Sequence, residues 1–145
     1  MNIKGSAKIL FVFVAVIFCG CVYYNTFFLA RKSYKRAEKL RKKAGGDNIP
    51  SAATSLYEKA IEKSSKVLAY YKETDYVDDA LFLLGMCFTR MGDYTKALRK
   101  YNELLSNFPE SEFAQDARYW RSVCLYYGGE EEIALDSLEA IAEDN

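Results

Sequence analysis

The sequence has no histidine among its 145 residues, only two prolines and eight glycines, and no alternating run of β-branched side chains. Histidine is the commonest general base and transition-metal ligand, so its absence excludes Ser–His–Asp and Cys–His catalysis, histidine zinc sites and two-histidine iron sites. The sequence also contains no glycine-rich phosphate loop, no metal-spaced cysteine cluster and no pairing of a nucleophile with a base. We therefore expect neither an enzyme nor a bound cofactor or metal ion.

The abundant residues favour helices. Alanine, leucine, lysine and glutamate are frequent while glycine and proline are scarce, which predicts an all-α chain. The length allows one compact domain beside a targeting segment. Basic and acidic residues balance at 20 each, but residues 31–43 hold eight basic residues and one acid, whereas residues 129–145 hold seven acids and no base. Opposite charges at the two ends are not typical of a general nucleic-acid binder, and no nucleic-acid partner is expected.

The first 20 residues have the pattern of an export signal. Residues 1–8 carry two lysines and no acid, and ten apolar residues follow at 9–18 before a Cys-Gly-Cys sequence that ends at Cys21. A charged start, a short apolar stretch and a small-residue cleavage site are typical of a signal peptide. The last four residues up to Cys21 resemble a bacterial lipobox, in which a peptidase cuts before a lipid-modified cysteine. The resemblance implies a lipoprotein signal peptide over residues 1–20 and an acylated, palmitate-bearing Cys21.

An uncleaved membrane helix is the alternative to cleavage. Apolar character continues past Cys21 as far as Ala30, so residues 9–30 are long enough to span a bilayer if Asn25 and Thr26 are tolerated. A ten-residue apolar stretch is the length found in a signal peptide and favours the lipoprotein. Either anchor would tether the rest of the chain to a membrane, on the side away from the cytoplasm.

The residue after Cys21 indicates the outer membrane. Lipoproteins retained at the inner membrane of enteric bacteria resemble one another in having aspartate at this position, whereas the present chain has Val22. The resemblance therefore implies an outer-membrane lipoprotein that faces the periplasm. Residues 31–43 are expected to form a solvated or head-group-facing side of a helix, and their charge would add attraction to an anionic membrane.

The sequence repeats itself with a period of 37 residues. The shift aligns Asp79 with Asp116, Ala80 with Ala117, Cys87 with Cys124, Gly92 with Gly129, and Ala97 with Ala134. A period of a few tens of residues made of two helices is the mark of an α-solenoid, in which stacking covers the apolar face of each unit. We predict that residues 21–50 form a lipidated N-terminus with a basic helix and a linker, and that residues 51–145 form the helical repeats.

One period, residues 78–109, contains a helix, a turn and a second helix. Apolar residues at steps of three and four mark the first helix, and Gly92 ends it. The second helix ends near Pro109, because a proline ring cannot continue a helix. Small side chains at Gly85 and Ala97 are expected to let the two helix backbones approach closely.

This order of residues resembles the tetratricopeptide repeat. The residues that match its pattern, and that we expect to pack the repeats, are Leu81, Gly85, Phe88, Gly92, Ala97, Tyr101 and Pro109, with Ser122 and Ala134 in the next copy. The resemblance implies an all-α solenoid of about three antiparallel helix pairs, of which the first pair matches least well. It also implies a non-catalytic adaptor that binds protein segments.

The period and the Phe-Pro-Glu-Ser junction at residues 108–111 are similar to those of bacterial envelope lipoproteins of the BamD and YbgF families. A BamD-like chain implies a scaffold in the assembly of outer-membrane β-barrel proteins, and a YbgF-like chain implies a partner of the Tol-Pal system. SusD-type nutrient-binding lipoproteins also contain such repeats, but they are several times longer and carry ligand loops. The sequence leaves homo-oligomer formation open.

The concave face is where tetratricopeptide repeats bind peptides, and the resemblance places seven residues of this chain there. These groove candidates are Phe82, Met86 and Thr89 from one copy and Tyr119, Val123, Tyr126 and Tyr127 from the next. Aromatic and methionine side chains make adaptable apolar contacts. Filling the stack between copies is the alternative role for Tyr119 and Tyr126.

Two cysteines, Cys87 and Cys124, occupy equivalent positions in successive copies. An oxidising periplasm would permit them to form a disulfide. Equivalent positions on neighbouring helices lie about 8–10 Å apart, however, and a disulfide spans a Cα separation of at most about 7 Å. We expect two unpaired, buried thiols that pack as small hydrophobic side chains.

Overall fold

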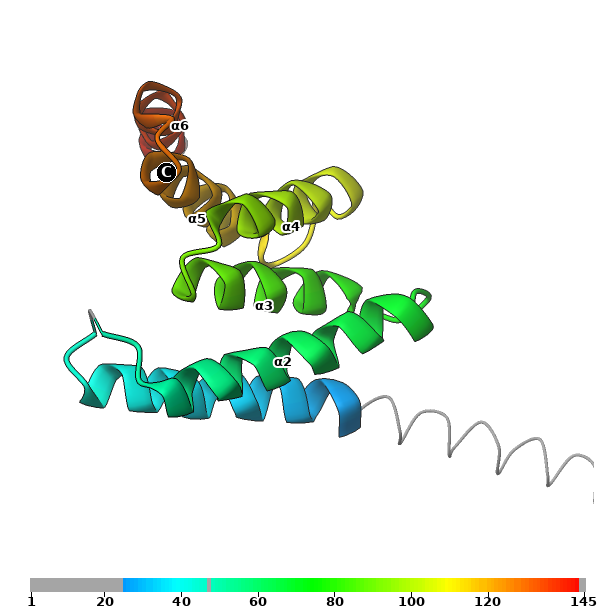
Figure 1. Ribbon diagram of the computed structural model, residues 1–145. Helices are drawn as coiled ribbons and strands as arrows, with labels where there is room; N and C mark the ends of the chain where they lie inside the picture. The colour runs from blue at the N-terminus through cyan, green and yellow to red at the C-terminus, as the bar shows by residue number, and fades with distance from the viewer. Residues whose placement is uncertain (1–24, 47, 144–145) are drawn as a thin grey trace, which may run out of the picture.

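The computed structural model describes residues 25–46 and 48–143, which form helices joined by short loops (Figure 1). Residues 25–43 form the first described helix. Five more helices follow: α2 (Ser51–Tyr70), α3 (Val77–Arg90), α4 (Tyr94–Asn107), α5 (Ala114–Tyr127) and α6 (Glu131–Glu143). No strand occurs within these ranges, and the all-α prediction is confirmed.

The helices form three antiparallel pairs that stack in chain order. The first helix pairs with α2, α3 with α4, and α5 with α6, while contacts between α2 and α3 and between α4 and α5 join the pairs. The α3 and α5 helices also touch, so the first helices of successive pairs are neighbours. The stack runs from the N-terminal pair at one end to α6 at the other (Figure 1). The predicted solenoid of about three helix pairs is confirmed.

The predicted signal peptide and the lipidation site Cys21 lie outside the described residues. Within residues 25–46 and 48–143, no helix is both long enough and apolar enough to cross a membrane. The membrane anchor therefore stays a prediction from the sequence.

The turns inside the second and third pairs are closed in the same way. Gly92 and Gly129 adopt φ angles of 77° and 93°, which residues with a side chain rarely adopt. In both turns the following N–H group donates to a carbonyl five residues back, Asp93 to Phe88 and Glu130 to Leu125, each at 2.9 Å. This closure satisfies a carbonyl that the end of a helix would otherwise leave without a partner.

The loops between pairs repeat as well. The N–H groups of Tyr71 and Phe108 donate to carbonyls four residues back, at 2.9 and 2.7 Å. The N–H groups of Thr74 and Ser111 then donate to carbonyls three residues back, at 3.3 and 3.1 Å. Each equivalent pair is separated by the 37 residues found in the sequence, so the backbone itself repeats from the end of α2 to the start of α6.

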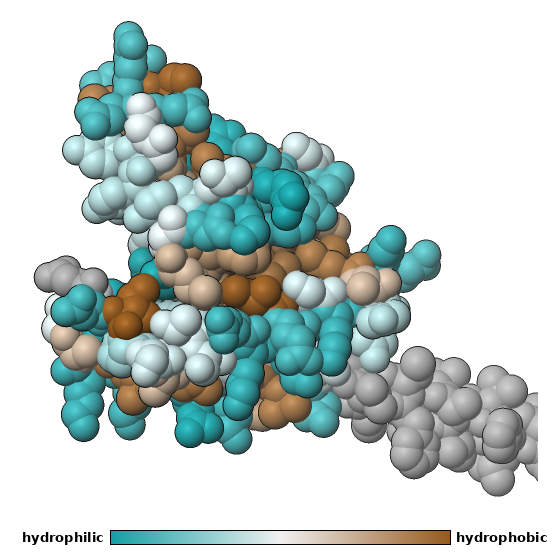
Figure 2. All heavy atoms as spheres, viewed as in Figure 1, coloured by the Kyte–Doolittle hydropathy of each residue, from teal (hydrophilic) through white to brown (hydrophobic). Residues whose placement is uncertain are grey.

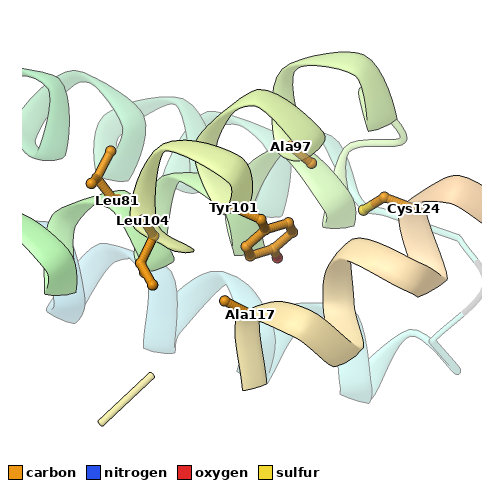
Figure 3. Close-up of a cluster of buried hydrophobic side chains, with 6 residues drawn as sticks. All are labelled: Leu81, Ala97, Tyr101, Leu104, Ala117 and Cys124. Atoms are coloured by element: carbon orange, nitrogen blue, oxygen red, sulfur yellow. The ribbon is translucent and has the colours of Figure 1, made fainter. Parts of the chain in front are cut away.

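Tyr101 lies at the centre of the core between α3, α4 and α5 (Figure 3). Its side chain is fully buried among Leu81, Ala97, Leu104, Ala117 and Cys124. A Cβ atom added at Gly85 would overlap the ring of Tyr101. The glycine thus makes room for a ring, where the sequence predicted room for a neighbouring backbone.

The other predicted packing residues vary in burial. Ser122 and Ala134 are buried, Phe88 is half-buried, and Pro109 is exposed just beyond the end of α4.

Both cysteines of the repeats are buried and unpaired, as predicted. Cys87 packs from α3 against the first pair, and Cys124 packs beside Tyr101. Burial raises the pKa of both thiols, which keeps them protonated and chemically inert.

Candidate functional site

An open groove of about 600 Å³ lies where α3, α4, α5 and α6 face the end of the first helix and the loop that follows it. We call it the aromatic groove. Its lining residues are Arg41, Gly46, Ile49, Thr89, Arg90, Tyr94, Tyr119, Trp120, Val123, Tyr126, Tyr127 and Leu138.

One wall of the aromatic groove is α5, which presents Tyr119, Val123, Tyr126 and Tyr127 at steps of three and four residues. The three tyrosines are 46%, 45% and 63% exposed. Tyr127 stacks on Tyr94 of α4 with ring centroids 5.4 Å apart, and Tyr126 meets Tyr127 edge-on at 5.5 Å. Exposed rings held against one another form an apolar wall that the side chains of a partner can cover.

An acidic residue of the first helix holds two arginines at the opposite wall. Glu38 accepts hydrogen bonds from Arg41 at 3.2 Å and from Nε of Arg90 at 3.3 Å. The hydroxyl of Tyr57 on α2 also donates to Glu38. The guanidinium of Arg90 lies over the ring of Trp120, 4.6 Å from its centroid. Glu38 therefore fixes Arg90 between the first helix and α5.

The carboxylate charge of Glu38 is stabilised by these contacts. Burial raises the pKa of Glu38, but hydrogen bonds from Arg41 and Tyr57 and the charge of Arg90 outweigh burial and hold the pKa below its usual range. Glu38 is thus ionised at neutral pH and offsets one of the two arginine charges. Among the described residues that line or touch the groove, one positive charge is left to attract an anionic group of a ligand.

Five of the seven predicted groove residues line the aromatic groove, namely Thr89, Tyr119, Val123, Tyr126 and Tyr127. Thr89 is only 8% exposed, and its hydroxyl lies 2.9 to 3.2 Å from the Gly85 carbonyl, the Tyr101 hydroxyl and the Cys124 sulfur. It therefore contributes little polar surface to the groove. The exposure of Tyr119 and Tyr126 favours contact with a ligand over filling of the stack.

The other two predicted residues, Phe82 and Met86, lie apart from the aromatic groove. Phe82 lines a smaller hollow of about 200 Å³ between the first helix and α3. Its ring stacks on Phe113 with centroids 4.9 Å apart, and Phe113 comes from the loop before α5. Met86 is half-buried on α3 and lines neither hollow. A loop residue, Phe113, therefore covers the ring that Phe82 was predicted to offer to a ligand.

Sequence reasoning missed several residues of the site. These are Glu38, Arg41, Arg90 and Tyr94. Only Glu38 leaves a signal in the sequence, as the single acid among eight basic residues in the segment 31–43. An acid placed alone among cations is a candidate for an internal ion pair, and this one pairs with an arginine 52 residues away.

Aromatic side chains form the largest group among those that line the aromatic groove, and two arginines stand beside them. Within the described ranges, no group of histidine, cysteine, aspartate and glutamate side chains could hold a metal ion. The groove instead offers rings and one unbalanced positive charge, which suit the binding of a peptide.

Residues 79–111, which cover most of α3 and all of α4, match the family model of the tetratricopeptide repeat. No curated protein matches the chain. The chain therefore contains a tetratricopeptide repeat, as the residue pattern predicted, and its backbone geometry recurs in the turn and loops around α5. Repeats of this kind are protein-interaction modules and are generally not enzymes.

Proposed function

We propose that the chain is a non-catalytic scaffold of the bacterial envelope, anchored to the outer membrane through Cys21, whose aromatic groove binds a segment of a partner protein in the periplasm. The observation that carries the binding role is the aromatic groove. Three half-exposed tyrosines of α5 line it, and it lies beside a repeat whose family generally binds proteins. The export-signal pattern and the lipobox-like sequence before Val22 support the location.

The groove defines the chemistry of the segment it binds. The tyrosine wall suits apolar or aromatic side chains, and Arg90 with Arg41 suits a carboxylate. A volume of about 600 Å³ falls within the range of roughly 300 to 1,000 Å³ that ligand sites occupy. A short peptide with apolar side chains and one acidic group fits both features.

The resemblance to BamD-like lipoproteins favours a role in the assembly of outer-membrane β-barrel proteins. A YbgF-like role in the Tol-Pal system is the alternative and would use the same groove. The identity of the bound protein distinguishes these two roles.

The test is photocrosslinking from the groove in intact cells. A benzoylphenylalanine replaces Tyr126, and a matched variant carries it at Tyr70, which is 77% exposed on α2 outside the groove. We expect the Tyr126 variant to capture one envelope protein that the Tyr70 variant does not capture, with mass spectrometry to identify it. Equal capture from both positions, or none from Tyr126, would contradict the proposed groove.

A further inference from the structure

The outward side of the first helix has an unusual composition. Between residues 28 and 43, every exposed side chain is either apolar or basic. The apolar ones are Phe28 and Leu29, which are 51% and 37% exposed. The basic ones are Arg31, Lys32, Lys35, Arg36, Lys39, Lys42 and Lys43. We call this surface the basic face.

The charges of the basic face are not neutralised within the helix. Its single acid, Glu38, is turned inward to Arg41 and Arg90 and does not pair with any residue of the basic face in the contacts described above. Ala30 and Ala37 mark the opposite side of the helix, which is fully buried against the rest of the fold. Seven of the eight basic residues of the segment 31–43 are therefore exposed on the basic face, while the eighth, Arg41, faces the aromatic groove.

Apolar surface lies directly beside these charges. A hollow of about 600 Å³ is lined by the rings of Phe27, Phe28 and Tyr76 together with basic side chains of the basic face. Hydrophilic side chains project along the edge of the molecule where the N-terminal pair lies (Figure 2). Rings bordered by cations match the two parts of a lipid, whose acyl chain is apolar and whose phosphate is anionic.

The predicted anchor lies close to this surface in the chain. Cys21 precedes Asn25, where the described part of the first helix begins, by four residues, and an extended chain of that length reaches about 14 Å at most. A lipid on Cys21 therefore keeps the basic face within reach of the bilayer, where its charges can act.

We propose that the basic face lies on an anionic membrane surface, with Phe28 and Leu29 at the level of the head groups and the basic side chains on lipid phosphates. The inference rests on the membrane anchor of the proposed function, because the lipid on Cys21 brings the basic face to the bilayer, where its positive charges add attraction to anionic lipids. This orientation leaves α6, at the other end of the stack, away from the membrane (Figure 1).

The test measures the reactivity of lysines in the full chain reconstituted into vesicles. Acetylation of Lys32, Lys35 and Lys39 is compared between vesicles of phosphatidylcholine alone and vesicles with 30% phosphatidylglycerol. Lys59 and Lys72 are exposed outside the basic face and serve as internal controls. We expect anionic vesicles to protect the first three lysines severalfold, with the protection lost in high salt and the control lysines unchanged.

Arginine variants leave the reporter lysines in place. Each basic residue near an anionic surface contributes about a fivefold factor to binding, so Arg31→Gln/Arg36→Gln should weaken the association of the basic face on the order of 25-fold. The matched variant Arg99→Gln/Arg118→Gln removes two exposed arginines from α4 and α5 and should leave the protection unchanged.

Two outcomes would overturn the proposal. Equal acetylation in both vesicle types, in a chain that still sediments with the vesicles, would show that the anchor holds while the basic face stays off the membrane. Protection that appears in phosphatidylcholine vesicles and grows with protein concentration would assign the basic face to the acidic helix α6 of a second copy. Failure to sediment would contradict the anchor itself, and groove crosslinking tests the partner-binding role independently.

Discussion

At the scale of single residues, the pair Gly85 and Tyr101 shows what the repeat pattern requires. The ring of Tyr101 occupies the space that any side chain at Gly85 would need. Its hydroxyl lies 3.1 Å from that of Thr89, which in turn lies 3.2 Å from the sulfur of Cys124. One tyrosine therefore connects α3, α4 and α5, and its position depends on the missing Cβ of its neighbour.

Gly85→Ala is expected to destabilise the fold by about 1 kcal/mol. Overpacking of a core costs about 1–3 kcal/mol, and alanine returns about 1 kcal/mol through its better helix propensity. The measurement is urea denaturation of the full chain. In a Tyr101→Leu background the clash is absent, so the same change should become neutral or stabilising. An equal loss in both backgrounds would contradict the role assigned to the ring.

At the scale of elements, α6 differs from the helices before it. Among its 13 residues only Ala134 is buried, while Ile133 and Leu135 are more than half exposed. The 14-residue α3 helix buries seven residues, because α2, α4 and α5 all pack on it. Tertiary contacts therefore stabilise α6 less than they stabilise α3.

Hydrogen exchange should reflect this difference. Amides of α6 are expected to exchange by local opening at a free energy well below that of global unfolding, whereas amides of α3 should exchange only with the whole fold. Exchange of the full chain followed by mass spectrometry measures both helices in one experiment. Equal protection of α6 and α3 would mean that α6 is held by contacts the structure does not contain.

The sequence predicted the α3–α4 and α5–α6 pairs because the same residue types recur at buried positions and turns. Gly92 and Gly129 recur where a positive φ is needed, and Ala97 and Ala134 recur where two helices pack. The groove was predicted less completely. Equivalent positions define a concave face, but they do not report which loop covers it, and Phe113 covers Phe82.

At the scale of the whole molecule, the first pair is joined to the repeats by an ionic contact as well as by apolar packing. Glu38 bonds to Arg41 on its own helix, to Tyr57 on α2 and to Arg90 on α3. The shift of 37 residues places Asp75 and Tyr127 at the positions equivalent to Glu38 and Arg90, so the pair does not recur and no periodicity in the sequence could reveal it. The contact orients one wall of the aromatic groove through Arg90 and Trp120.

Glu38→Gln should lower the free energy of unfolding by about 1–3 kcal/mol at pH 7, because hydrogen bonds to a charged group are replaced by weaker ones. The native contacts lower the pKa of Glu38, so its contribution is present above the unfolded value of 4.5 and is lost as the pH falls through the lower folded value. The difference between variant and parent should therefore shrink in acid. Denaturation at several pH values measures it.

Glu58→Gln is the matched control, since Glu58 is exposed on α2. It should leave the stability unchanged at every pH. A loss from Glu38→Gln that persisted in acid would show that the shape of the side chain, and not its charge, holds the first pair in place.

The repeated hydrogen bonds of the loops have a consequence for how such a chain can change over evolution. Since the junction that begins at Tyr71 and the one that begins at Phe108 use the same bonds, a duplicated 37-residue segment spliced between them would meet compatible geometry on both sides. Tandem gene duplication could then lengthen the array by whole units without remodelling either neighbour. Each added unit would move the basic first helix further from the acidic helix α6.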